Sequence, residues 1–347
     1  MKFSDYYSIS QTGMQFRRIK TCVVVLICLF TIPLDGHSKR AAGILKFYTR
    51  LPIHRNANNT YAIDADVNDL TIPLKRVGNL FLIDAVVDNQ IGNLIFDTGA
   101  MGLVLNTTYY RNHVIEDSHP SNGVNGSISS VSTINIDRLS FSELTLKRIR
   151  ADLTDLGHIE NRRNVKILGL LGLSLIKDFE IIIDVNNNQL QLFRIDKKGN
   201  RLNTKIKDFQ ADITQPFETS NNVIFLRGTI KGKKLNFCMD TGSETNVISN
   251  RSSKEVLSSI TITRRSSLQG SGSKKSEVFY GTMNNFIYFN KELTGMETII
   301  TNLDGLSDAY GVQIDGVLGY DFLNKGVVCI NLEKKQMGIC FLKPEAK

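Results

Sequence analysis

The sequence contains little cysteine, five residues in a chain of 347. Cys22 and Cys28 fall within the first 38 residues, which leaves too few for the disulfide framework that holds many small exported domains together. Cys238 lies in an apolar run and is expected in a core. Cys329 and Cys340 flank a predicted hairpin, where they form either a cross-strand disulfide or, as we favour, two side chains that face one core.

Motifs of several catalytic classes are also absent. His54, His113, His119 and His158 show neither the HExxH pattern nor another metal-ligand spacing. The chain has no Gly-x-Ser-x-Gly elbow and no Walker loop for nucleotide phosphates. We therefore expect no metal site, no cofactor, no serine nucleophile of the elbow type and no NTPase activity.

The chain is basic, with a formal net charge of +8, but its basic pairs are scattered. They lie in polar connections without interleaved aromatic residues, a pattern that indicates solvated loops and not a nucleic-acid surface. The pairs are Arg162-Arg163, Lys233-Lys234, Arg264-Arg265 and Lys274-Lys275.

The apolar stretch from Cys22 to Leu34 follows three basic residues and precedes the small residues Gly36 and Ser38. This order is typical of a secretory signal, and the stretch is shorter than the roughly 20 residues of a membrane-spanning helix. We predict an exported protein, periplasmic, envelope-associated or secreted, with residues 1–38 removed before Lys39. A retained N-terminal anchor is the alternative and the only expected link to a membrane.

Two stretches of the chain repeat. Residues 73–106 align without a gap with residues 216–249 at an offset of 143 (240 − 97). Residues 170–193 align with residues 317–340 at an offset of 147 (319 − 172). Repeats this long indicate two copies of one domain, with four additional residues in a loop of the second copy.

Both copies have the pattern of β domains. Apolar, β-branched runs at residues 79–87 and 92–96 are joined by a polar turn, and the second copy repeats them. One or two helical turns are expected at each Leu-Gly segment.

The predicted fold is all-β, with two homologous lobes related by a pseudo-twofold axis and a cleft between them. We place lobe 1 at residues 66–195, a polar linker at 196–208 and lobe 2 at 209–347. Residues 39–65 form either an inhibitory prosegment or an edge strand or tether.

Each copy carries Asp-Thr-Gly directly after an apolar strand, at Asp97 and at Asp240. Packing about the pseudo-twofold axis would bring the two carboxylates face to face. Because two adjacent carboxylates do not readily ionise together, they hold one proton between them, and one acts as acid and the other as base. Such a pair can activate water for attack on a carbonyl group.

These motifs resemble those of the aspartic proteases, with the retroviral-type β-barrel domain duplicated in one chain as in the pepsin-like enzymes. The resemblance covers about residues 66–344 and is expected to indicate an exported bacterial member. It implies that Asp97 and Asp240 are catalytic and that the two motif loops support each other. The residues expected to support the loops are Thr98, Gly99, Ala100, Leu171, Gly172, Thr241, Gly242, Ser243, Leu318 and Gly319.

The resemblance also implies a β-hairpin flap over the cleft. Its candidates are the glycine-rich segments 121–130, with Gly123 and Gly126, and 268–277, with Gly270 and Gly272. Glu244 is expected to hold substrate backbone, a role that its counterpart Met101 cannot take. Ser243 is expected to donate its hydroxyl to the Asp240 carboxylate.

The sequence thus predicts an aspartic endopeptidase that acts on polypeptides. The protein is expected to be a monomer because both lobes lie in one chain. The alternative is a pepsin-like protein that has lost catalysis and only binds polypeptides. The two intact motifs favour catalysis.

Overall fold

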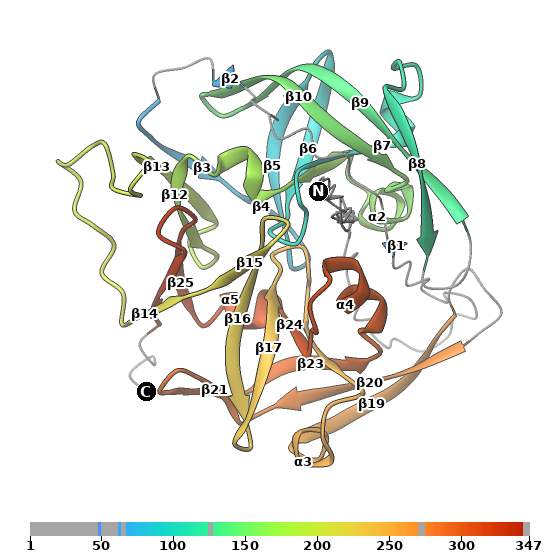
Figure 1. The fold of residues 1–347 in the computed structure, drawn as a ribbon, viewed down its shortest axis with the longest axis vertical. Coiled ribbons are helices and arrows are strands. Elements are labelled where there is room, and N and C mark those ends of the chain that lie inside the picture. The colour runs from blue at the N-terminus through green and yellow to red at the C-terminus, as the bar shows by residue number, and fades with distance from the viewer. Residues whose placement is uncertain (1–47, 50–61, 64–66, 124–127, 270–274, 343–347) are drawn as a thin grey trace, which may run out of the picture.

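The computed structural model describes residues 48–49, 62–63, 67–123, 128–269 and 275–342 (Figure 1). The predicted leader at residues 1–38 and most of the segment 39–65 lie outside these ranges. Of that segment, two short strands are described, Tyr48–Thr49 (β1) and Ala62–Ile63 (β2), which pair with lobe 1. None of the helices in the described ranges has the length and apolarity needed to span a bilayer.

Lobe 1 is built on a sheet of ten described strands. Because β5 pairs with both β6 and β9, the path β9-β10-β7-β11-β6-β5 closes into a six-stranded barrel. Besides β1 and β2, this sheet consists of β4 (Lys75–Val77), β5 (Leu80–Val87), β6 (Gln90–Phe96), β7 (Leu103–Asn106), β8 (Asp117–Gly123), β9 (Ile128–Phe141), β10 (Leu144–Thr154) and β11 (Ile167–Leu171).

Lobe 2 repeats this arrangement in a second sheet of ten described strands. The equivalent of β9 is here divided into β20 and β21, and β21 keeps the closing contact with β16. The strands are β15 (Glu218–Ser220), β16 (Val223–Ile230), β17 (Lys233–Met239), β18 (Asn246–Ser249), β19 (Ile260–Gln269), β20 (Lys275–Met283), β21 (Phe286–Tyr288), β22 (Lys291–Leu293), β23 (Met296–Thr301) and β24 (Gly316–Leu318).

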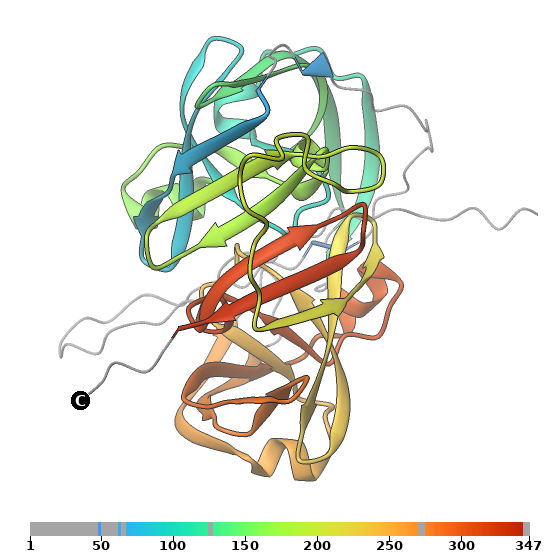
Figure 2. The same cartoon turned by 90° about the vertical axis from the view of Figure 1, so that its left-hand side faces the viewer.

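A third sheet of six strands joins the lobes, in the order β14-β26-β25-β12-β13-β3. Figure 2 shows it between the two barrels, and its central pair is antiparallel, with Ile182 of lobe 1 opposite Cys329 of lobe 2. Its strands are β3 (Asp69–Pro73), β12 (Phe179–Asp184), β13 (Gln189–Arg194), β14 (Ile213–Pro216), β25 (Gly326–Asn331) and β26 (Gln336–Phe341).

Short helices follow equivalent strands in the two lobes. The turn η1 (Leu173–Ile176) and helix α5 (Tyr320–Leu323) follow the Leu-Gly segments, which confirms the helical turns predicted there. The other helices are α1 (Thr107–Tyr110), α2 (Gly157–Arg163), α3 (Lys254–Ser258) and α4 (Asp304–Tyr310).

The four additional residues of lobe 2 lie in one loop. Helix α1 follows β7 directly, whereas residues 250–253 separate β18 from α3. From this loop onward equivalent elements keep the offset of 147, as in α1 and α3 (254 − 107). The predicted loop insertion is therefore confirmed.

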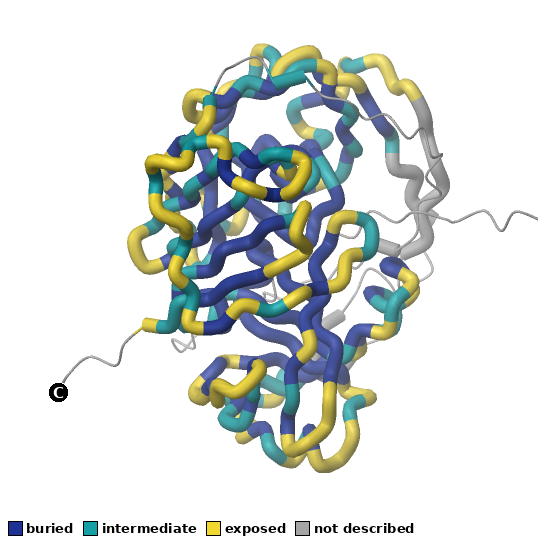
Figure 3. Tube along the Cα trace, turned by 60° about the vertical axis from the view of Figure 1, so that its left-hand side comes forward, coloured by how far each residue is buried: buried dark blue, intermediate teal, exposed yellow. Residues whose placement is uncertain are grey.

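The core follows the alternation of the strands. In β10 apolar residues are buried at every second position over most of its length, whereas all five residues of β11 are buried because this strand is covered on both faces. One apolar cluster extends through both lobes, and Figure 3 shows buried strands running between them while exposed residues gather at turns.

No disulfide joins the cysteines of the described residues. The register of β25 and β26 places Cys329 opposite Gly338 and Cys340 opposite Val327, so the two sulfur atoms do not form the cross-strand disulfide. Cys238 is buried, as predicted, and of the pair expected to face one core Cys329 is buried whereas Cys340 is only partly buried.

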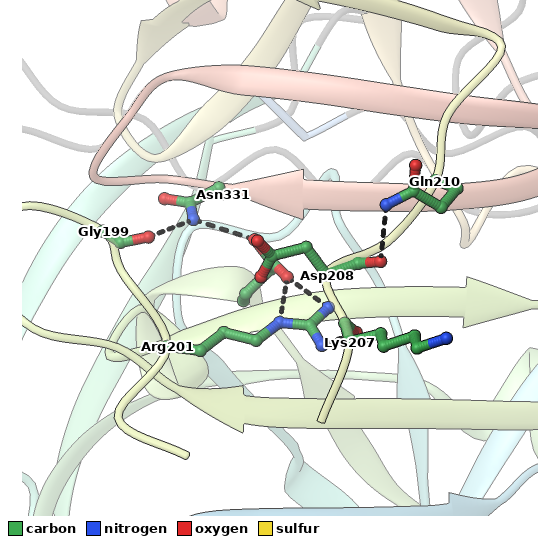
Figure 4. Close-up of polar contacts among 7 residues, drawn as sticks. Gly199, Arg201, Lys207, Asp208, Gln210 and Asn331 are labelled. Atoms are coloured by element: carbon green, nitrogen blue, oxygen red, sulfur yellow. Dashed lines mark hydrogen bonds and ion pairs between the residues drawn. The ribbon is translucent and has the colours of Figure 1, made fainter. Parts of the chain in front are cut away.

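The predicted linker is fixed to the six-stranded sheet. Arg201 forms a buried ion pair with Glu180 of β12 and donates to Lys207 O at 3.0 Å. Asn331 of β25 donates to Glu180 and to Gly199 O, as Figure 4 shows for the linker contacts. The linker therefore contacts strands from both lobes.

Candidate active site

Strands β6 and β17 deliver the two motif aspartates. Each strand ends in a buried apolar run, so that Asp97 is only 2% exposed and Asp240 is fully buried. The backbone N–H of Asp97 donates to Leu171 O at 3.0 Å, and that of Asp240 donates to Leu318 O at 3.0 Å. The Leu-Gly strands β11 and β24 thus lie beside the motif strands in the way the sequence predicts.

The threonines join the two loops by a reciprocal set of hydrogen bonds. The backbone N–H of Thr98 donates to Thr241 Oγ1, and that of Thr241 donates to Thr98 Oγ1, both at 3.0 Å. Each hydroxyl then donates to a carbonyl oxygen of the other lobe, Thr98 to Met239 at 2.9 Å and Thr241 to Phe96 at 2.7 Å. The loops are therefore held together by four buried bonds.

The motif glycines allow the carboxylates to approach each other. A Cβ at Gly99 would lie 2.9 Å from Asp240 Cγ, and one at Gly242 would lie 2.8 Å from Asp97 Cγ. Gly172 and Gly319 allow the supporting strands to approach in the same way, because a Cβ there would lie 2.4 Å and 2.5 Å from carbonyl oxygens of the motif loops. Gly99 and Gly242 therefore lie at the junction of the lobes, and Gly172 and Gly319 lie under the motif loop of their own lobe.

The two carboxylates hydrogen-bond to each other but differ in their other partners. Asp97 Oδ1 accepts from the N–H groups of Gly99 at 2.8 Å and Ala100 at 3.1 Å. Asp240 Oδ1 accepts from Gly242 N–H at 2.8 Å, and the backbone N–H of Gly99 in lobe 1 also favours the ionised form of Asp240.

Burial raises the pKa of both carboxyl groups. The pKa of Asp97 rises to about 6 because burial outweighs the hydrogen bonds that favour its ionised form. The pKa of Asp240 is raised well above its usual range by burial and then by the charge of Asp97. The two groups titrate as a pair. Within its own loop Asp97 Oδ1 accepts two N–H bonds whereas Asp240 Oδ1 accepts one, so Asp97 is the member whose ionised form the backbone favours more.

The expected bond from Ser243 to Asp240 is wrong. The Ser243 hydroxyl donates instead to Thr245 O at 2.7 Å, within its own loop. The hydroxyl is satisfied there, so it supports the loop backbone and does not stabilise the carboxylate. Ala100, its counterpart, is buried in an apolar cluster of lobe 1 with Val104 and Leu156.

Glu244 contacts lobe 1. Both of its carboxylate oxygens accept from Arg163, and Oε1 also accepts from Asn79 N–H at 3.1 Å. Met101 packs into the apolar cluster of lobe 2. A role of Glu244 in holding substrate backbone stays a prediction, because its carboxylate is engaged by lobe 1 in this structure.

The described residues of both flap candidates lie in pairs of antiparallel strands. Strands β8 and β9 pair from Asp117 opposite Thr133 to Asn122 opposite Ile128, and β19 and β20 form the equivalent hairpin. Gly123 is the last residue of β8, whereas Gly126, Gly270 and Gly272 lie outside the described residues. Contact of either hairpin with substrate stays a prediction.

The sequence interpretation missed two residues beside the motif loops, Arg163 and Tyr310. They end the equivalent helices α2 and α4, and the Tyr310 hydroxyl donates to Gly99 O at 2.7 Å. Their offset of 147 (310 − 163) is that of the second repeat, so an alignment extended upstream from the Leu-Gly segments would have paired them.

Comparisons with known proteins match the same two regions. The family model described as aspartyl protease matches residues 83–175 and 226–322, which include both motifs and both Leu-Gly segments. A crystal structure of a retropepsin-like aspartic protease from Rickettsia conorii is similar at 20% identity and a TM-score of 0.26, over 38% of this chain and 93% of that chain. No curated protein matches the sequence. Since the two family segments together span more than half of the 347 residues, the chain belongs to the aspartyl protease family.

Proposed function

We propose that this chain is an aspartic endopeptidase that hydrolyses polypeptides with a water molecule activated by Asp97 and Asp240. The main support is the contact between the two buried carboxylates, each of which lies against the motif glycine of the other lobe. Carboxyl groups in such contact lose their protons in two separate steps. Between these steps one group is a base and the other an acid.

Asp97 is the base in the first step because the backbone of its own loop favours its ionised form more. It takes a proton from water as the water oxygen bonds to the carbonyl carbon, while Asp240 gives its proton to the carbonyl oxygen. In the second step Asp97 passes its proton to the amide nitrogen as the C–N bond breaks. Asp240 recovers a proton from a hydroxyl of the intermediate as the product carboxylic acid forms, so the pair ends with one proton, as it began.

The reaction requires an ionised Asp97, which sets the pH range of activity. Since the pKa of Asp97 is raised to about 6, kcat/KM should rise as the pH increases through this value. The pKa of Asp240 is also raised, by burial and by the charge of Asp97, and loss of its proton should set the basic limb of the profile. We expect the acidic limb of the profile near pH 6, above the limb expected of a strongly acid-adapted enzyme.

We propose further that the enzyme is exported and acts as a monomer. The leader pattern of residues 1–38 supports export, and the presence of two lobes in one chain supports a monomeric enzyme. Hydrogen bonds between the two lobes of one chain hold the loops of both aspartates together. A second copy is therefore not needed to complete the pair.

The test is a peptide-library digest with protein that begins at Lys39, comparing wild type with Asp97→Asn and Asp240→Asn. Each variant keeps the side-chain shape but removes the acid or base, so each should lose nearly all hydrolysis. Asp184→Asn is the matched control, because its carboxylate accepts hydrogen bonds from Asn187 far from the motif loops. This control should cleave the library like wild type.

Near-normal turnover by either motif variant would refute the assignment of the pair. If folded wild type cleaves nothing between pH 3 and 8 yet binds library peptides, the chain is a binding protein and the proposal fails. Melting temperatures of all four proteins show whether loss of activity reflects loss of the fold.

A further inference from the structure

The last residues of helices α2 and α4, Arg163 and Tyr310, occupy equivalent positions in the two lobes. Each contacts the motif loop of the lobe to which it does not belong. The chemistry of the two contacts differs, since one is ionic and the other combines a neutral hydroxyl with apolar packing.

Tyr310 of lobe 2 holds the loop of Asp97. Its hydroxyl donates to Gly99 O at 2.7 Å, two residues after the aspartate. Its ring packs edge-on against Phe225, with centroids 5.7 Å apart, in the apolar cluster that also contains Met101 of lobe 1. The loop of Asp97 is thus attached to lobe 2 through its backbone and through the side chain of Met101.

Arg163 of lobe 1 holds the loop of Asp240. It donates to both carboxylate oxygens of Glu244, four residues after the aspartate, and this carboxylate is only 7% exposed. Asn79 adds a backbone bond to Oε1 at 3.1 Å and a side-chain bond to Glu244 O at 3.0 Å. Gly78 permits this contact because it has a φ of +65° and a Cβ there would lie 2.7 Å from Glu244 Oε1.

From these contacts we infer that Arg163 and Tyr310 are positioning residues for the aspartate pair, each fixing the motif loop of the opposite lobe. This inference rests on the proposed function. Their contacts are with Glu244 and Gly99, beside the aspartates in sequence, so we class them as positioning residues and not as catalytic residues. They act by holding the loops that set the separation and orientation of the two carboxylates, on which the transfer of protons depends.

Tyr310→Phe tests the lobe 2 contact with the smallest change. It removes one O–H group, keeps the ring and leaves Gly99 O without this donor. We expect kcat to fall about tenfold with little change in KM, since loss of one buried hydrogen bond is of this size. Tyr288→Phe is the matched control, because Tyr288 is also fully buried in lobe 2 and its hydroxyl has no partner among the described residues. Its kcat should equal that of wild type.

Arg163→Met tests the lobe 1 contact. Arg163→Lys keeps the positive charge and should therefore retain a higher kcat than Arg163→Met. Arg201→Met is the matched control, since Arg201 also pairs with a largely buried carboxylate but lies in the linker. Both Met variants should be less stable, but only Arg163→Met should lower kcat of the folded enzyme. Because the Arg163 and Glu244 side chains are only 21% and 7% exposed, added salt should screen their contact little, and the difference in kcat between wild type and Arg163→Met should persist at high salt.

The titration of the two aspartates by carboxyl-carbon NMR provides a readout that needs no turnover. Tyr310→Phe and Arg163→Lys should each shift an apparent pKa of the pair, whereas Tyr288→Phe should not. Unchanged titration together with unchanged kcat in both variants would overturn the inference. If wild type cleaves no peptide, the proposed function fails, and the NMR shifts alone decide whether these residues position the pair.

Discussion

Thr98→Val is the sharpest test of how the two lobes are joined. Valine keeps the branched shape of the side chain but replaces Oγ1 with a methyl group. Thr98 Oγ1 accepts from Thr241 N–H at 3.0 Å and donates to Met239 O at 2.9 Å. The substitution leaves one buried donor and one buried acceptor of lobe 2 without their partner.

The expected loss of stability follows from these two groups. A buried polar group left without a partner costs about 1–3 kcal/mol, so with two such groups the variant should lose about 2–6 kcal/mol of unfolding free energy. That is a large part of the roughly 5–15 kcal/mol by which folded proteins are usually stable. Thr98→Ser keeps the hydroxyl and removes one methyl group, which should cost only about 1 kcal/mol.

Urea unfolding of wild type, Thr98→Val and Thr98→Ser measures these differences. By the symmetry of the contacts, Thr241→Val should lose as much as Thr98→Val, because it leaves Thr98 N–H and Phe96 O without partners. Equal stabilities of the Val and Ser variants at residue 98 would show that the hydroxyl does not join the lobes, and the reasoning would be refuted.

Three further predictions concern the pair and its export. The pKa of Asp97 is about 6 in the folded chain against 3.8 unfolded, so the folded state binds more protons between these values and stability should fall as pH rises from about 4 to 6. The raised pKa of Asp240 adds to this fall, so in urea unfolding Asp97→Asn should make the slope shallower without abolishing it, and an unchanged slope would contradict the assignment. Gly99→Ala should lower kcat/KM at least about a hundredfold, because its Cβ would lie 2.9 Å from Asp240 Cγ and displace that carboxylate. Gly102→Ala is the control and should keep near-normal kinetics, because its Cβ meets nothing closer than Ser174 Oγ at 3.5 Å. Equal activity of the two variants would show that a side chain at residue 99 does not displace Asp240. N-terminal sequencing of the exported protein should begin at about Lys39, and an intact N-terminus in the membrane fraction would favour an anchor.

Much of the fold follows from the sequence because the chain contains its own internal comparison. The repeated Asp-Thr-Gly and Leu-Gly segments fix which strands are equivalent, and a pseudo-twofold arrangement then brings Asp97 to Asp240. The change of offset between the two repeats locates the additional residues between the motifs of lobe 2, and the structure places them at residues 250–253. These features are local in sequence and needed no knowledge of side-chain direction.

The remaining parts depend on contacts that no repeat encodes. Ser243 follows the motif directly, yet its hydroxyl rotates toward Thr245 O, and only the three-dimensional loop decides this direction. Arg163 and Tyr310 occupy equivalent positions but have unrelated side chains, so their common role cannot be recognised from residue type. The pairing of Ile182 with Cys329 across the lobes is likewise a long-range register that an apolar pattern leaves open.

The reciprocal threonine bonds have a consequence for how the chain becomes active during its synthesis. Lobe 1 is made first, but its Thr98 N–H and the loop of Asp97 find their partners only after Thr241 and Tyr310 have been added. Until then Asp97 lacks the burial that raises its pKa, and no second carboxylate stands beside it. On the proposed mechanism a nascent or half-folded chain lacks the aspartate pair, so we expect hydrolysis only after translation has passed the second motif and the two lobes have packed together.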